Sequence, residues 1–147
     1  LTGYIQAPIV HAIHETCVHL KKHGIQRVGI MATDGTIRSK LFQRELENHG
    51  MEALIPGPEG QKCIMSVIYD DIKANKPAGM DKFELASRQL RDQGAEAIIL
   101  GCTELSLVKR DYPIGAGYLD AMEVLARRCV IACGGKLKEE YQNLITK

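Results

Sequence analysis

The chain has 147 residues, of which 45% are apolar and 25% charged, and its formal net charge is +1. This length and apolar content suffice for one domain with its own hydrophobic core. The balanced charge argues against a nucleic acid or an anionic membrane as a partner. The sequence contains no apolar run of the roughly 20 residues that span a bilayer, and we see no secretion signal. We therefore expect a cytoplasmic protein.

The cysteines and histidines give no support for a disulfide framework or a metal site. The five cysteines are Cys17, Cys63, Cys102, Cys129 and Cys133. Their odd number and the absence of a Cys-x-x-Cys pair predict reduced thiols. His19 and His23 share a helical face, but two imidazoles alone make a poor metal site, and no His/Cys cluster has the spacing of zinc ligands. We expect no metal.

The first half of the chain alternates helices and short strands. Apolar residues at spacings of three and four predict a helix from Pro8 to Gly24, with Pro8 in its first turn. The elements that follow are a strand at 27–32, a helix from about 37 to 50, a strand at 52–55 and a helix at 61–74. Glycines or prolines separate most of them, as is typical of turns between elements.

The second half continues the pattern. Its predicted elements are a helix at 80–93, a strand at 95–100, an irregular stretch after Tyr112 and a last long helix that Asp120 caps and Gly134 ends. Short strands alternating with helices imply βαβ units. The fold class is therefore α/β, a three-layer sandwich with a short parallel sheet. Ligands bind such sheets at the carboxyl ends of the strands, which here are the loops 33–36 and 101–104.

The loop at 33–36 carries Thr33, Gly35 and Thr36 where a helix begins. Free N–H groups at a helix start favour an anion, and the threonine hydroxyls add donors. An ordinary turn with Thr33 or Asp34 as the helix cap explains the same residues, and on local sequence it is the better reading. The chain lacks the glycine patterns of P-loops and dinucleotide sites, so we expect no nucleotide.

The loop at 101–104 reads Gly-Cys-Thr-Glu directly after a buried strand. A helix N-terminus lowers the pKa of a thiol, while the carboxylate of Glu104 near Cys102 raises it or exchanges protons with it. This combination suits a proton-transfer thiol better than a metal ligand. Cys17, Cys129 and Cys133 lie on apolar helix faces and are predicted to be buried structural thiols.

Three segments together resemble the aspartate/glutamate racemase superfamily, and its aspartate racemase branch in particular. They are VGIMATDGTIRSKLFQRELENHGMEALIP, IYDDIK and GAEAIILGCTELSL, in this order. The resemblance runs from about residue 8 to 135. It implies one half of a two-domain, pseudo-symmetric fold and a cofactor-independent enzyme in which two cysteines transfer protons at the α-carbon of an acidic amino acid.

Carried over residue by residue, the resemblance implies roles for both loops. Cys102 is then the catalytic thiol of the second domain, and Glu104 tunes it or relays its proton. The implied substrate-binding residues are Thr33, Gly35, Thr36, Lys73 and Thr103. Lysine, hydroxyl and backbone N–H donors suit a substrate carboxylate on which negative charge develops.

The resemblance also implies a missing part, because family members carry a first domain with its own cysteine. We expect residues 1–23 to be the helix that ends that domain, 24–116 to be the second domain, and 117–147 to be helices that pack back on the first. The chain is then a fragment, a natural truncation or part of an assembly, and self-association is expected to cover its apolar helix faces.

Two other functions stay open. With a single catalytic thiol, the chain also suits a one-thiol arylmalonate decarboxylase or a maleate isomerase. It also suits a non-catalytic module that binds an amino acid. The Thr-Glu pair after Cys102 favours the racemase.

Overall fold

The computed structural model describes residues 9–147, and its centre is a parallel four-stranded sheet in the order β2-β1-β3-β4. The strands are β1 (Arg27–Met31), β2 (Glu52–Leu54), β3 (Ala97–Leu100) and β4 (Tyr118–Asp120). The helices are α1 (Ala12–Lys22), α2 (Asp34–Ser39), α3 (Leu41–Asn48), α4 (Pro58–Ser66), the π-helix η1 (Val67–Ile72), α5 (Met80–Asp92), α6 (Thr103–Asp111), α7 (Ala121–Ala132) and the 3-10 turn η2 (Glu139–Tyr141).

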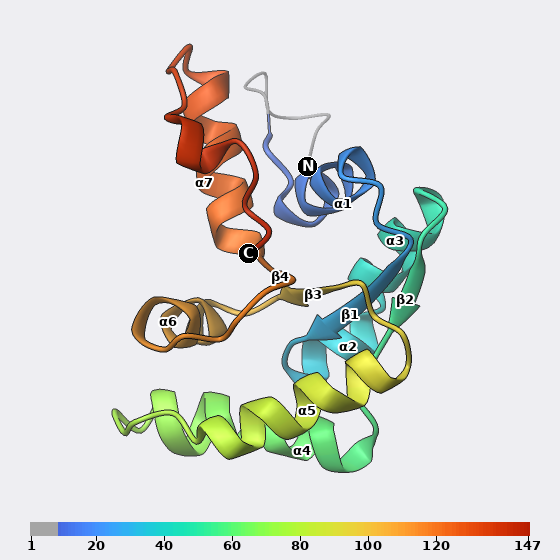
Figure 1. Ribbon diagram of the computed structural model, residues 1–147, viewed down its shortest axis with the longest axis vertical. Coiled ribbons are helices and arrows are strands. Elements are labelled where there is room, and N and C mark those ends of the chain that lie inside the picture. The colour runs from blue at the N-terminus through green and yellow to red at the C-terminus, as the bar shows by residue number, and fades with distance from the viewer. Residues whose placement is uncertain (1–8) are drawn as a thin grey trace.

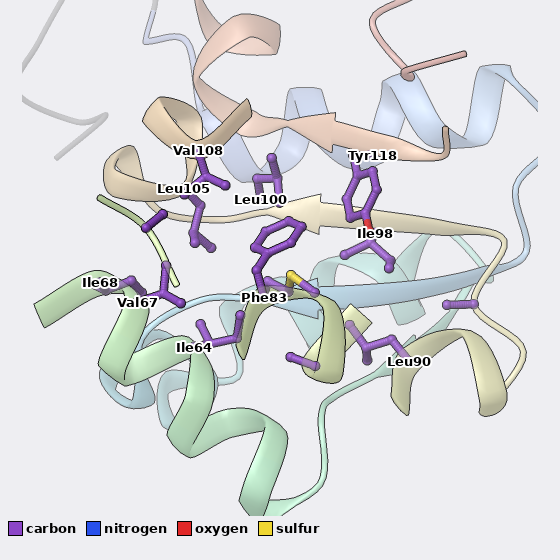
Figure 2. Packing of buried hydrophobic residues seen from close by; sticks show 14 of the residues in the cluster. Ile64, Val67, Ile68, Phe83, Leu90, Ile98, Leu100, Leu105, Val108 and Tyr118 are labelled. Atoms are coloured by element: carbon purple, nitrogen blue, oxygen red, sulfur yellow. The ribbon is translucent and has the colours of Figure 1, made fainter. Parts of the chain in front are cut away.

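Two hydrophobic clusters lie on opposite faces of the sheet, because successive strand residues point to opposite sides. Ile98 and Leu100 of β3 join the cluster formed with α4, η1, α5 and α6, in which Phe83 is almost fully buried. Figure 2 shows this cluster, with Phe83 among side chains from the sheet and the surrounding helices. Ile99 joins the other cluster, with α1, α3 and α7. The predicted three-layer α/β sandwich is confirmed.

The strands at 27–32, 52–55 and 95–100 are confirmed within one or two residues at their ends. The prediction of an irregular stretch after Tyr112 is wrong for its last residues, because Tyr118–Asp120 forms the strand β4. Only three residues long, β4 pairs with β3 on one side. On its other side, Tyr118 O accepts a hydrogen bond from Thr146 N at 2.8 Å, so the C-terminal tail returns to the sheet edge.

Three predicted helices differ in detail. The helix at 37–50 is divided into α2 and α3 by Lys40, which has a left-handed φ of 56° without being glycine. The helix at 61–74 begins earlier, at Pro58, and changes to π-helical hydrogen bonding at Val67. The first helix begins at Ala12, and the predicted role of Pro8 lies outside the described residues.

Helix α7 extends from β4 beside α1 (Figure 1), and these two helices pack against each other. Asp120 caps α7 as predicted, accepting a hydrogen bond from Met122 N at 2.9 Å. The predicted burial of Cys129 and Cys133 is wrong, because both are exposed on the outer part of α7. Cys17, by contrast, is fully buried as predicted. Within the described part of the chain, no helix is long and apolar enough to cross a bilayer.

Candidate functional site

The two loops singled out in the sequence leave the sheet side by side. Their strands, β1 and β3, are neighbours in parallel register, with Met31 opposite Leu100. Gly101 N donates a hydrogen bond to Met31 O at 2.8 Å, which extends the pairing past the strand end. A Cβ atom at Gly101 would lie 3.1 Å from Phe42 Cε2 and 3.3 Å from Ala32 Cβ. Glycine therefore permits the close approach of the two loops.

Cys102, Thr103, Glu104 and Lys73 form a connected group at this edge. The Cys102 thiol donates a hydrogen bond to Glu104 Oε2 at 2.6 Å, and the Thr103 hydroxyl donates to the same oxygen at 3.0 Å. Lys73 Nζ lies 3.6 Å from the other oxygen, Oε1. The structure thus gathers three of the predicted site residues around the carboxylate of a fourth, Glu104, and we call these four residues the thiol–carboxylate cluster.

Electrostatics keep the proton on the sulfur in this cluster. Burial raises the pKa of the Cys102 thiol, and the hydrogen bond to Glu104 raises it further, to about 11. The same hydrogen bond, together with those from Thr103 and its own backbone and the charge of Lys73, lowers the pKa of Glu104. The lowered thiol pKa that a helix N-terminus alone suggests is therefore not found. At neutral pH the pair is a thiol beside a carboxylate.

Lys73 reaches the cluster from the end of the π-helix η1. Its backbone N–H donates to Ile68 O at 3.0 Å, five residues back, which is the π-helical pattern. The side chain is exposed, and its Nζ also lies 4.3 Å from the centre of the Tyr69 ring. The lysine is thus held beside Glu104 while its charge remains accessible to a ligand.

The loop after β1 is a capped turn, the alternative that the local sequence favoured. Thr33 caps α2, its hydroxyl oxygen accepting from Thr36 N at 3.3 Å. The Thr33 and Thr36 hydroxyl oxygens lie 3.1 Å apart, and Gly35 between them is exposed. Within the described part of the chain, no hydrogen bond links Thr33, Gly35 or Thr36 to Cys102. Substrate binding by Thr33, Gly35 and Thr36 stays a prediction.

Two positioning residues were not singled out for the site. Gln61 Nε2 donates to Ala32 O at 3.0 Å and to Asp34 Oδ1 at 2.8 Å, which ties the loop after β1 to α4. Asp120 is buried at the end of β4 and accepts from the Ser106 hydroxyl at 2.8 Å, which ties α6 to α7. Gln61 has no local motif in the sequence, and the local sequence indicated Asp120 only as a helix cap. Only the expectation that strand ends converge could have pointed to Asp120.

The fold and this group of residues define an α/β domain with a thiol–carboxylate pair at the carboxyl edge of a parallel sheet. The chain belongs to the Asp/Glu/hydantoin racemase family, whose family model matches residues 1–129. The family is named for racemases, which are isomerases. It is also 30% identical over 129 residues to a protein of Pectobacterium carotovorum described as "Uncharacterized protein in pnlA 3'region", with 85% of each chain covered.

Solved structures share the fold. An aspartate racemase of Picrophilus torridus matches 95% of this chain with a TM-score of 0.74 and 24% identity. An aspartate racemase homologue of Pyrococcus horikoshii matches 90% with a TM-score of 0.80 and 22% identity. A putative Asp/Glu racemase of Yersinia pestis matches 85% with a TM-score of 0.75 and 24% identity. The chain covers only 58%, 59% and 56% of these three chains, respectively. It thus corresponds to roughly one half of their fold.

Proposed function

We propose that this chain carries one proton-transferring half of a cofactor-independent racemase for an acidic amino acid, aspartate or glutamate. The observation that supports this most is the hydrogen bond of 2.6 Å between the Cys102 thiol and Glu104, with Lys73 at the other carboxylate oxygen. A structural cysteine needs no such partners. A sulfur that gives and regains a proton needs partners with which the proton can be exchanged.

In this proposal Cys102 delivers a proton to the α-carbon. With its pKa near 11 the sulfur is protonated at neutral pH, as a donor must be. When the thiol gives up its proton, the thiolate forms beside the negative Glu104, and this repulsion favours recapture of a proton. The S–H bond breaks as the C–H bond forms, and Glu104 returns a proton to the sulfur from solvent. In the opposite direction of reaction, the thiolate removes the α-proton.

The α-proton of an amino acid is very weakly acidic, so the site has to stabilise the negative charge that develops on the substrate carboxylate. In the proposal, the hydroxyl of Thr103 and the turn formed by Thr33, Gly35 and Thr36 supply donors for this charge. Lys73 supplies a cation for the second carboxylate of a dicarboxylic substrate. The exposure of Lys73 and Thr103 supports this, because both can reach a ligand without rearrangement of the core.

Racemisation needs a second acid–base group on the opposite side of the α-carbon. Among the described residues, the other thiols do not lie in the cluster: Cys17 is fully buried, Cys63 lies in α4, and Cys129 and Cys133 lie at α7. We propose that a first domain or a second copy of the chain supplies it. Residues 1–23, of which 1–8 lie outside the described residues, and residues 117–147 would pack against that part. The exposed apolar residues Val18, Met122, Val130 and Ile131 on α1 and α7 support this.

The presence of Cys102 as the single thiol of the thiol–carboxylate cluster also favours the second candidate, a one-thiol decarboxylase of arylmalonates or a maleate isomerase, in which protonation occurs from one side. For either chemistry we propose a cytoplasmic location, because a working thiol has to stay reduced.

Two measurements test the proposal. Differential alkylation followed by mass spectrometry should show that aspartate or glutamate protects Cys102, and that alanine, which lacks the second carboxylate, does not. Proton NMR in D₂O should show loss of the α-proton signal of aspartate or glutamate, and Cys102→Ser should abolish it. The exchange is measured with the chain at high concentration, so that a second copy is present.

The outcomes separate the candidates. Release of carbon dioxide from an arylmalonate, or isomerisation of maleate, without α-proton exchange would replace the racemase by the one-thiol enzyme. Protection without exchange, with binding unchanged in Cys102→Ser, would indicate a binding module. Protection of Cys63 or Cys17 in place of Cys102 would show that the ligand binds elsewhere and would refute the proposed site.

A further inference from the structure

Three potential metal ligands lie together on the outer surface of the α1–α3 layer. His14 Nδ1 lies 2.7 Å from Glu45 Oε1, and His49 Nε2 lies 3.2 Å from the same oxygen. The three ligand atoms are all within 4.8 Å of one another. None of these residues belongs to the thiol–carboxylate cluster.

Packing of the helices brings the three residues together. His14 lies in the first turn of α1, where His11 caps the helix by accepting a hydrogen bond from His14 N at 3.3 Å. Glu45 and His49 are four residues apart at the end of α3, so they share one helix face. Beneath them, buried Cys17 of α1 and Leu46 of α3 belong to the same hydrophobic cluster. The backbone positions of the three ligands are therefore fixed by the core.

The donor set is that of a three-ligand zinc site. Two imidazoles and one carboxylate bind zinc in catalytic sites, where water takes the fourth position. A tetrahedral ion with bonds of about 2.0–2.1 Å holds its ligand atoms about 3.3–3.4 Å apart. The distances from Glu45 Oε1 to His14 Nδ1 and to His49 Nε2 are already near or below this value. The side chain of His14 is half exposed, at 50%, so it has room to move into a tetrahedral arrangement. The open side faces solvent, so a water can complete the coordination.

We propose that His14, Glu45 and His49 bind one Zn²⁺ ion, which fastens α1 to α3, with water as the fourth ligand. Imidazole selects ions of the later transition series over Mg²⁺ and Ca²⁺, which prefer oxygen ligands. Co²⁺ is therefore expected to bind as well, and Mg²⁺ is not. Cys17 is not a ligand, because its side chain is fully buried in the hydrophobic cluster beneath the three residues.

This proposal departs from the expectation from sequence that the chain has no metal site. The sequence directed attention to His19 and His23, whose rings lie 4.4 Å apart in α1. His19 is almost completely buried and its Nε2 accepts a hydrogen bond from Leu144 N at 3.3 Å, so it is not free to bind an ion. The proposed ligands are 31 residues apart in sequence, from His14 to Glu45, which no local spacing rule detects.

The test uses the complete chain after removal of any affinity tag and treatment with a chelator. Isothermal titration with Zn²⁺ should give one site per chain, Co²⁺ should show the visible absorption of a four-coordinate complex, and Zn²⁺ should raise the Tm. Each of His14→Gln, Glu45→Gln and His49→Gln should weaken binding at least about tenfold, because loss of a direct ligand costs no less than loss of a supporting residue.

The matched controls are His23→Gln at the C-terminal cap of α1 and Glu47→Gln in α3, which should bind Zn²⁺ as the unsubstituted chain does. Circular dichroism of the metal-free variants confirms that they are folded. Binding that survives all three ligand substitutions, or that is lost in His23→Gln, would overturn the proposal. An absence of saturable binding to the unsubstituted chain would overturn it too, and would leave Glu45 as a hydrogen-bond acceptor shared by the two imidazoles.

Discussion

Replacing Glu104 by glutamine should make the Cys102 sulfur more reactive, although the substitution removes a residue of the proposed catalytic pair. The carboxylate accepts the thiol hydrogen bond at 2.6 Å and, after burial, is the main reason for the high pKa of the thiol. Glutamine keeps the size of the side chain and removes its negative charge. The thiolate of the variant then no longer forms next to an anion, so it forms more readily.

The magnitude follows from the pKa of about 11, compared with the usual 9.0. Burial, the largest cause, stays in Glu104→Gln, so we expect the pKa to fall about halfway, to roughly 10, and the thiolate fraction at pH 8 to rise about tenfold. A thiolate of lower pKa is intrinsically less nucleophilic, by about threefold for this change. The net expectation is that thiol–disulfide exchange becomes roughly threefold faster.

The assay follows the absorbance released from a neutral aromatic disulfide, because a charged reagent would itself respond to the loss of Glu104. Cys63, Cys129 and Cys133 are replaced by serine in every protein compared, and Cys17 is fully buried. Glu47→Gln, at an exposed position of α3, serves as the control and should leave the rate unchanged. A slower or equal rate in Glu104→Gln, from pH 7 to 9, would refute the electrostatic reasoning.

Two further predictions concern stability and are checked by urea denaturation. Burial lowers the pKa of His19 in the folded state to about 4, whereas the imidazole of the unfolded chain takes up a proton near pH 6.5. The contribution of His19 to stability is therefore fully present above pH 6.5 and is lost below it. At pH 5 we expect the free energy of unfolding to be lower by about 2 kcal/mol. His19→Gln should lack most of this loss, and an equal loss in both proteins would contradict the assignment. Gly101→Ala should cost about 1–3 kcal/mol, because its Cβ would lie 3.1 Å from Phe42 and 3.3 Å from Ala32. Gly35→Ala is the control, because its Cβ would meet only Thr33 Oγ1, at an ordinary contact distance of 3.9 Å, and equal costs would show that the loops are not closely packed.

Strong apolar runs and periodic helices were predictable because local sequence decides them. Ala97–Leu100 is apolar at every position and buried at every position, so its assignment to a central strand needed no knowledge of its neighbours. β4 was missed because three residues are too few for a pattern and because it is defined by its partners, β3 and the returning tail. The break at Lys40 has no glycine or proline to signal it.

The part of the site that lies within one loop was predictable from the sequence. Cys102, Thr103 and Glu104 are adjacent, so their proximity is a property of the sequence. The approach of Lys73 to Glu104 depends on how α6 packs against η1, which only the fold determines. The pKa of Cys102 likewise depends on burial, and the local argument from the helix N-terminus gave the wrong direction.

The π-helical segment makes the length of one helix matter for the chemistry of a different loop. A π-turn holds one more residue than an α-helical turn. Deleting one residue between Val67 and Ile72 would therefore restore α-helical hydrogen bonding and leave the following side chains near their present directions. Deleting one residue from the preceding α4, which is regular, would rotate every following side chain by about 100° about the helix axis. Lys73 would then swing away from Glu104, and the buried carboxylate of Asp71 would leave Lys82, which it now meets at 3.1 Å. An insertion or deletion in α4 would thus change the surroundings of Glu104, and through it of the Cys102 sulfur, while every residue of the Gly-Cys-Thr-Glu loop stayed the same.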